Sequence, residues 1–249
     1  MIDSKIAPKV ALITNVREYA GPGTTEALLE NGMIVVGHDK CFVDSDAAGA
    51  FKEGRERLFT TSEQAPVALI QSVIEKHGRI DALISNDVVP NPLRPIDGST
   101  EADYRDVLEA GAVYPFALSQ AVLPHMRARQ SGAIIFVTSA TALHPMGEAA
   151  IYCASRAATT AYAIGLGQML GPDNIQVNAV GPHWTKNSTY FPDGWEEMMP
   201  DLALKLKKEI PLRRLGTQAE IGAVIALLAS QRAMPLTAQF INFAAGAYP

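Results

Sequence analysis

Three side chains in one short segment could perform acid–base chemistry on a substrate oxygen. Ser139 follows an apolar run, Tyr152 comes thirteen residues later, and Arg156 comes four residues after Tyr152. Residues four apart share one face of a helix, so Arg156 can lie beside Tyr152. A phenol is a poor base at neutral pH unless a fixed cation favours its phenolate. The spacing therefore predicts that Tyr152 moves a proton beside Arg156, while Ser139 hydrogen-bonds the same substrate oxygen.

This chemistry needs a strand that delivers Ser139 and a helix that carries Tyr152 and Arg156. Apolar runs typical of strands recur along the chain, with helix-patterned segments between them. The runs are apolar on both faces, as in a parallel sheet covered by helices on both sides. We therefore expect an α/β fold with a doubly wound parallel sheet. The runs cover residues 10–14, 34–38, 80–85, 133–138, 175–180 and 239–243.

The expected helices carry ordinary start and stop signals. Pro22 suits a first helical position, Gly78 suits a helix end, and Thr217 with Glu220 forms a capping box. The segment 181–201 is irregular and aromatic, and it directly follows a strand. Ligands of such sheets bind beyond the carboxyl ends of the strands, so this segment is a pocket candidate. The helices are expected at residues 22–31, 63–77, 100–129, 147–170, roughly 195–208, and 218–230.

The composition excludes several classes of partner. The chain of 249 residues has a formal net charge of −5, which argues against a nucleic-acid or anionic-membrane surface. Its two cysteines, Cys41 and Cys153, have no metal-type spacing, so we expect no metal site. No apolar run reaches the roughly 18 residues of a membrane span. We expect one domain over residues 1–249, a cytoplasmic location and a small-molecule partner.

The order of motifs resembles a known superfamily. A strand followed by Ser139, Tyr152 and Arg156 is similar to the Ser…Tyr-x-x-x-Lys motif of short-chain dehydrogenases/reductases, with arginine in place of lysine. Further similar segments are residues 21–23 after the first strand, 177–182 after the sixth, and 213–217 before the last helix. The resemblance covers nearly the whole chain. It implies a Rossmann-like sheet of about seven strands.

The chain departs from these dehydrogenases where they bind a nicotinamide cofactor. A dinucleotide site needs glycines where the backbone approaches the pyrophosphate. Asn15 stands at the family's first glycine, and Glu18 and Tyr19 add a repelling carboxylate and a bulky ring. Arg156 also has a larger head than the lysine that grips the nicotinamide ribose. We therefore expect no cofactor.

Together these changes resemble the halohydrin dehalogenases, a branch of the same superfamily in which a halide site replaces the nicotinamide site. The resemblance implies cofactor-independent conversion of a vicinal haloalcohol to an epoxide, with release of halide and a proton. It also implies the reverse opening of epoxides by small anions. The catalytic residues would be Ser139, Tyr152 and Arg156.

The resemblance also assigns a halide and substrate site. Backbone N–H groups of the segment Pro182, His183, Trp184 and Thr185 are expected to bind the halide, with His183 contributing only its backbone. Asp87 could accept hydrogen bonds that orient this halide loop, or it could be a solvated or capping residue. The apolar walls and the substrate pocket near Ser139 would come from Tyr19, Tyr190, Phe191 and Thr141.

Two other functions stay open from the sequence. The chain could be an NAD(P)-dependent alcohol dehydrogenase or carbonyl reductase that uses Arg156 in place of lysine. It could also be a non-catalytic binding module on the same fold. The family resemblance further implies a homotetramer formed through the helices at 100–129 and 147–170 and the last strand.

Overall fold

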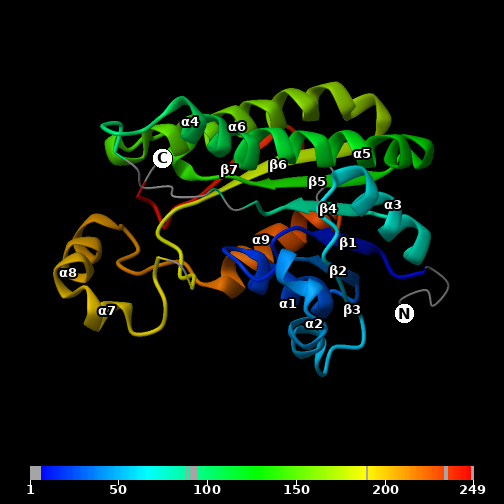
Figure 1. The fold of residues 1–249 in the computed structure, drawn as a ribbon, viewed down its shortest axis with the longest axis horizontal. Helices are drawn as coiled ribbons and strands as arrows, with labels where there is room; N and C mark the ends of the chain where they lie inside the picture. The colour runs from blue at the N-terminus through cyan, green and yellow to red at the C-terminus, as the bar shows by residue number, and fades with distance from the viewer. Residues whose placement is uncertain (1–6, 88, 90–94, 189, 233–234, 248–249) are drawn as a thin grey trace.

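The described strands form one parallel sheet. The computed structural model describes residues 7–87, 89, 95–188, 190–232 and 235–247. Within them seven strands pair in the order β3-β2-β1-β4-β5-β6-β7, which confirms the predicted doubly wound α/β fold (Figure 1). That residues 1–249 form one domain stays a prediction. The strands are β1 Val10–Ile13, β2 Ile34–His38, β3 Leu58–Thr61, β4 Ala82–Ser85, β5 Gly132–Val137, β6 Ile175–Pro182 and β7 Gln239–Phe243.

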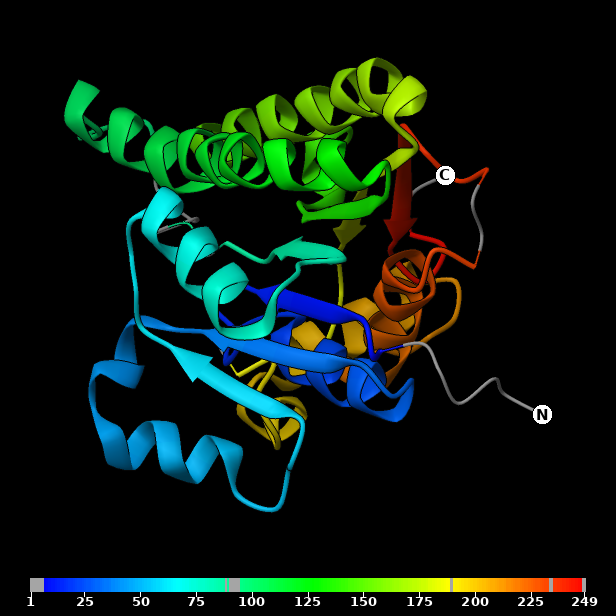
Figure 2. The ribbon, with the colours of Figure 1, turned by 90° about the vertical axis from the view of Figure 1, so that its right-hand side faces the viewer.

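Helices cover both faces of the sheet, and Figure 2 shows the two layers. One face is covered by α1 Gly21–Glu30, α2 Ser45–Lys52 and α9 Gln218–Ala229; the other by α3 Pro66–His77, α4 Glu101–Leu108, α5 Tyr114–Arg129 and α6 Ala150–Leu170. Two short helices, α7 Trp195–Met198 and α8 Pro200–Glu209, extend past the carboxyl end of β6 (Figure 1). No helix in the described ranges is long and apolar enough to span a membrane. The 3-10 turns are η1 Lys40–Val43, η3 Ala140–Ala142, η4 Gly147–Ala149 and η5 Gly171–Asp173, and η2 Glu109–Val113 is a π-helix.

The strand order sets where a ligand can bind. The chain begins at the central strand β1, builds outward to β3 and then crosses over to β4 on the other side of β1. The crevice beyond β1 and β4 is the place where open α/β sheets bind ligands. β3 did not stand out in the sequence because it is an edge strand with only Leu58 fully buried, so it lacks a continuous apolar run.

Several predicted helices differ in detail from the observed ones. The segment 100–129 is interrupted by the π-helix η2, where a Cβ on Gly111 would meet the Ser155 side chain of α6 at 2.8 Å. The segment 195–208 is divided because α8 begins at Pro200. The capping box of Thr217 and the left-handed end at Gly78 are confirmed.

Two glycines let α1 and α9 approach very closely. A Cβ on Gly222 of α9 would lie 2.2 Å from the Gly23 carbonyl oxygen, and a Cβ on Gly23 would lie 1.9 Å from the Gln218 carbonyl oxygen. Neither position can carry a larger residue without moving a helix. In this chain Gly23 and Gly222 therefore serve helix packing. They also bring Gln218, the first residue of α9, next to the loop that follows β1.

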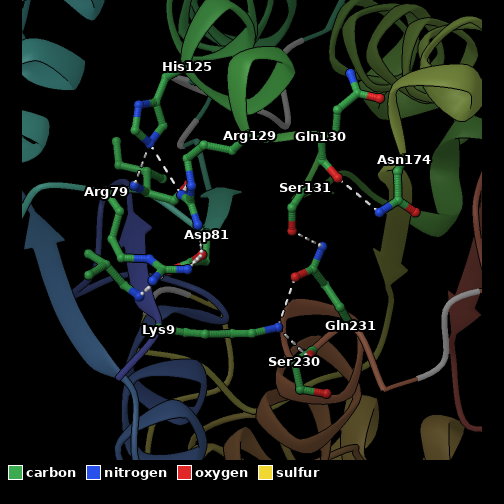
Figure 3. Close-up of polar contacts among 12 residues, drawn as sticks. Lys9, Arg79, Asp81, His125, Arg129, Gln130, Ser131, Asn174, Ser230 and Gln231 are labelled. Atoms are coloured by element: carbon green, nitrogen blue, oxygen red, sulfur yellow. Dashed lines mark hydrogen bonds and ion pairs between the residues drawn. The ribbon is translucent and has the colours of Figure 1, made fainter. Parts of the chain in front are cut away.

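A buried carboxylate ties the sheet together at its amino end, away from the crevice (Figure 3). Asp81 is about 1% exposed and accepts hydrogen bonds from Arg79 at 2.5 and 2.7 Å, from Arg129 at 2.8 Å, and from the Val10 amide at 2.8 Å. These contacts join β1, the start of β4 and the end of α5. Lys9 extends the network by donating to the Ser230 carbonyl at the end of α9.

The Asp81 network predicts acid-sensitive stability. Burial raises the pKa of Asp81, but the donors from Arg79, Arg129 and the Val10 amide outweigh burial and lower it. A carboxyl whose pKa falls on folding stabilises the protein above its unfolded pKa, and this stabilisation is lost as the pH drops through the folded pKa. We expect Asp81→Asn to reduce the free energy of unfolding by about 2–3 kcal/mol at pH 7, because two half-buried arginines lose their partner. Urea unfolding at pH 7 measures it.

The pH series provides the control. The difference between Asp81→Asn and the unaltered chain should shrink as the pH falls below the ordinary aspartate pKa of 3.8, because the unfolded chain then takes up a proton that the native carboxylate resists. An undiminished difference at low pH would contradict the electrostatic explanation.

Candidate active site

A cavity of about 440 Å³ opens beyond the carboxyl ends of β4, β5 and β6. Its walls come from the loops after β1, β4, β5 and β6 together with the starts of α6 and α9. The structure brings all the sequence-predicted site residues to this one cavity, although their roles stay predictions. They are Tyr19, Asp87, Ser139, Thr141, Tyr152, Arg156, Pro182, His183, Trp184, Thr185, Tyr190 and Phe191.

Ser139 is fixed as a hydrogen-bond donor toward the cavity. It follows β5 and caps η3, and its Oγ accepts from the Thr141 amide at 3.2 Å and from Thr141 Oγ1 at 2.9 Å. A hydroxyl that already accepts two hydrogen bonds has its own proton left to donate. Thr141, itself only 3% exposed, therefore orients Ser139 in addition to lining the pocket.

Arg156 is a buried cation beside the Tyr152 ring. Both residues lie on α6, and the guanidinium carbon of Arg156 is 5.1 Å from the centre of the Tyr152 ring. Arg156 is 3% exposed, and one terminal nitrogen donates to the Asp87 carbonyl oxygen at 2.8 Å. Its Nε has no hydrogen-bond partner among the described residues. The arrangement fixes a positive charge next to the phenol ring.

Asp87 supports the loop after β1 rather than the halide loop, which corrects the sequence expectation. Its carboxylate accepts from Thr14 Oγ1 at 2.8 Å, from Asn15 Nδ2 at 3.1 Å and from Ser85 Oγ. Burial raises the pKa of Asp87, although these donors and the nearby Arg156 oppose the rise. The carboxylate thus holds the loops after β1 and β4 together, and its own carbonyl holds Arg156.

The loop after β6, residues 183–188, places two successive backbone N–H groups beside the cavity. The amides of Trp184 and Thr185 donate to no acceptor within the described residues. Trp184 has a φ of 52°, and successive N–H groups in a turn with a left-handed residue can form an anion-binding concavity. Gly216 fixes the turn, because its N–H donates to the Trp184 carbonyl at 2.8 Å and its carbonyl accepts from the Lys186 amide at 2.9 Å.

The expected halide donors are therefore fewer than the sequence suggested. Pro182 has no N–H, and the His183 amide donates to the Phe243 carbonyl of β7 at 2.9 Å. Burial lowers the pKa of the His183 imidazole to about 4, with a smaller contribution from His144, so this ring is neutral at neutral pH. The expectation that the His183 amide binds a halide is wrong, since β7 already uses it.

The aromatic walls belong to two groups. Tyr19 and Tyr190 stack with their ring centres 6.0 Å apart, and their hydroxyl oxygens lie 3.3 Å from each other. Burial raises the pKa of Tyr19, and its contact with Tyr190 adds to the rise. Phe191 instead packs edge-on against Trp195 of α7 at 5.0 Å, so it also closes the small apolar cluster beneath α7 and α8.

Some lining residues escaped the sequence analysis. Met146, Met199 and Leu202 add apolar surface, and Asn86 and Gln218 add polar groups. Asn86 donates from Nδ2 to the carbonyls of Asn15 and Glu18 at 3.0 and 2.9 Å. No sequence signal distinguishes these side chains from ordinary loop or helix residues, because their direction depends on how the loops fold over the sheet.

The residues at the start of α1 do not fit a dinucleotide. The pyrophosphate of such a cofactor rests on the free N–H groups of this helix terminus. Here the Gly21 amide donates to the Glu18 carbonyl at 2.8 Å, Pro22 has no N–H, and the Gly23 amide donates to Gln218 Oε1 at 3.2 Å. Tyr19 extends from the same loop into the cavity. Among the described residues no group of His, Cys, Asp or Glu could hold a metal ion either.

Comparisons with known proteins agree with the fold. A family model described as enoyl-(acyl carrier protein) reductase matches residues 21–247. The chain belongs to the short-chain dehydrogenase/reductase superfamily. It is 29% identical to galactitol 2-dehydrogenase of Agrobacterium fabrum, over 96% of both chains.

Two solved structures have a higher sequence identity to this chain than galactitol 2-dehydrogenase has. One, described as a dehalogenation enzyme, is 38% identical with a TM-score of 0.91 and covers 97% of this chain and 98% of its own. The other is halohydrin dehalogenase HheC bound to ethyl (2S)-oxiran-2-ylacetate, 39% identical with a TM-score of 0.91 and 96% coverage of both chains. The epoxide bound to that neighbour supports a small-molecule substrate.

The occupied terminus of α1 predicts that nicotinamide cofactors do not bind. We expect titration with NADH or NADPH to give no saturable change in cofactor fluorescence up to millimolar concentrations, because the pyrophosphate finds no free donors. A dinucleotide-binding member of the superfamily serves as the positive control. Saturable binding at micromolar concentrations would contradict this reading of the loop after β1.

Proposed function

We propose that this protein converts vicinal haloalcohols to epoxides without a cofactor, releasing halide and a proton, and that it also opens epoxides with small anions. One observation carries the proposal: the cavity combines the Ser139, Tyr152 and Arg156 group with the unused amides of Trp184 and Thr185, where the halide would bind. The two dehalogenase neighbours support the same chemistry. The reaction class would be that of a carbon–halogen lyase.

The proton is handled by the side chains of α6 and η3. Ser139 donates its hydrogen bond to the substrate hydroxyl oxygen, and Tyr152 takes the hydroxyl proton. Arg156 stabilises the negative charge on the Tyr152 oxygen, since it is buried and fixed by the Asp87 carbonyl. The proton then passes from Tyr152 to water, so the base is ready for another turnover.

The halide leaves on the opposite side of the reacting carbon. The developing alkoxide attacks the adjacent carbon, the new C–O bond forms, and the halide departs with the electron pair of the C–halogen bond. Orientation supplies much of the acceleration, because nucleophile and leaving group are held in one molecule. The amides of Trp184 and Thr185 receive the halide, and the walls from Tyr19 and Tyr190 exclude water, which strengthens these contacts. No electron acceptor takes part.

The two alternatives use the same fold differently. An NAD(P)-dependent alcohol dehydrogenase or carbonyl reductase is supported by the family membership, as in the relative galactitol 2-dehydrogenase. It would need a dinucleotide at the start of α1, where protein atoms already use the donors. A binding module would keep the cavity without turnover. Halide release separates both from the proposed enzyme.

The proposed function is tested by halide release from a panel of 2-chloro and 2-bromo alcohols. We expect Tyr152→Phe to reduce the rate by about 10³-fold or more, because the base that takes the hydroxyl proton is lost. Ser139→Ala should reduce it by about 10²-fold, since the substrate oxygen loses its donor. Chloride or bromide is followed with a halide electrode, and circular dichroism checks the fold.

Tyr104→Phe is the matched control, because Tyr104 lies exposed on α4 and does not line the cavity. It should release halide at the rate of the unaltered chain. Failure of the unaltered chain to release halide from any member of the panel at any pH would overturn the proposed function.

We also propose a homotetramer that uses the outer face of α5 and α6. Apolar side chains remain exposed on this side of the protein, with Phe116 46% and Met169 56% exposed. A shallow depression lined by Val113, Phe116 and Tyr162 lies between η2, α5 and α6. Exposed apolar patches of this kind mark interfaces. A cytoplasmic location stays a prediction.

Light scattering after size exclusion tests the assembly. The unaltered chain should elute with four times the mass of one chain, and Phe116→Asp should shift it to smaller species because a charge cannot be buried in the apolar contact. A monomer at micromolar concentration would contradict the tetramer.

A further inference from the structure

The side chain of Gln218 joins the two loops that would enclose the anion. Gln218 is the first residue of α9, and its Nε2 donates to the Tyr19 carbonyl at 2.6 Å and to the Lys186 carbonyl at 2.6 Å. Its Oε1 accepts from the Gly23 amide of α1 at 3.2 Å. One side chain thus contacts the loop after β1, the loop after β6 and the first turn of α1.

The three hydrogen-bond partners determine the orientation of the Gln218 side-chain amide. The carbonyl oxygens of Tyr19 and Lys186 can only accept, and the Gly23 N–H can only donate. The Nε2 group must therefore face the two loops, and Oε1 must face α1. Both donors of the side chain are used, so neither a shorter residue nor a carboxylate of the same length can reproduce the three contacts.

The backbone of Gln218 is itself held in place. The Gly23 and Gly222 contact packs α9 tightly on α1, and Gly216, two residues before Gln218, pairs with the loop at Trp184 and Lys186. The loop after β6 is thus fixed on one side by Gly216. Gln218 links the backbone of this loop at Lys186 to the backbone of Tyr19, beside the side-chain contacts of Tyr19 with Tyr190 and of Ser188 with Glu18.

We infer that Gln218 is a positioning residue that keeps Tyr19 opposite the amides of Trp184 and Thr185 and thereby sets the anion affinity of the cavity. The inference rests on the proposed function, because it concerns the same anion site. Gln218 touches neither the anion nor the reacting carbon in this account. It acts through the two loops that it joins, and it occupies the α1 donor that a pyrophosphate would otherwise take.

The first test compares bromide binding by three variants, measured through tryptophan fluorescence and through competitive inhibition by sodium bromide. Gln218→Ala removes the link, so we expect about tenfold weaker bromide binding. Gln218→Glu keeps the length and the acceptor for Gly23, but it points carboxylate oxygens at two carbonyls. It should weaken binding at least as much as Gln218→Ala.

Thr217→Ala is the matched control. It removes the cap of the same helix, since Thr217 Oγ1 accepts from the Glu220 amide, but it touches neither loop. Its bromide affinity should stay within about twofold of the unaltered chain. The pH dependence of halide release should be unchanged in Gln218→Ala, because Ser139, Tyr152 and Arg156 are untouched.

Amide hydrogen exchange tests the link independently of turnover. In Gln218→Ala, peptides covering residues 15–20 and 184–187 should both exchange faster, whereas Thr217→Ala should affect only the start of α9. Unchanged bromide affinity in both Gln218 variants, or faster exchange confined to α9, would overturn the inference. If the unaltered chain releases no halide, the proposed function fails, and the exchange result alone then decides whether Gln218 joins the loops.

Discussion

The site depends on a guanidinium that is buried almost completely. A cation in the interior is costly unless polar groups surround it, and Arg156 is 3% exposed. Its terminal nitrogen uses the Asp87 carbonyl, and its guanidinium lies against the Tyr152 ring. Because that carbonyl must stay in place, the loop after β4 is fixed, and its side chains Asn86 and Asp87 in turn fix the loop after β1 through Asn15. The contacts that hold Arg156 in place therefore also hold the loop after β1 in place.

The contact between α1 and α9 explains why the start of α1 does not fit a dinucleotide, although the chain has the superfamily fold. Gly23, near the start of α1, permits the close contact between α1 and α9 at Gly222. That contact delivers the Gln218 amide to the helix terminus, where a neutral side chain satisfies a donor that other members offer to a phosphate. A glycine at position 23 therefore does not by itself indicate a cofactor site.

The sequence predicted the fold and the residues that line the cavity better than it predicted their contacts. Continuous apolar runs revealed the central strands, whereas the half-exposed edge strand β3 gave no such signal. The spacing of Ser139, Tyr152 and Arg156 was readable because strand end and helix face follow from local periodicity. The roles of Asp87 and of the His183 amide were misjudged, since both depend on pairing with β1 and β7, which lie far away in the sequence. Gln218 was missed for the same reason.

In the proposed reaction, the proton and the halide would be bound by different groups of the cavity. The positive charge of Arg156 lies beside Tyr152, where negative charge would develop on the base, whereas the halide would meet only N–H dipoles at Trp184 and Thr185. A full cation at the halide would bind the product tightly and slow its release, while neutral donors hold it with moderate strength. The neutral His183 ring fits this arrangement, because burial lowers its pKa to about 4 and adds no charge to the halide side. In the proposed reaction, this distribution of charge would favour departure of the halide as well as attack by the alkoxide.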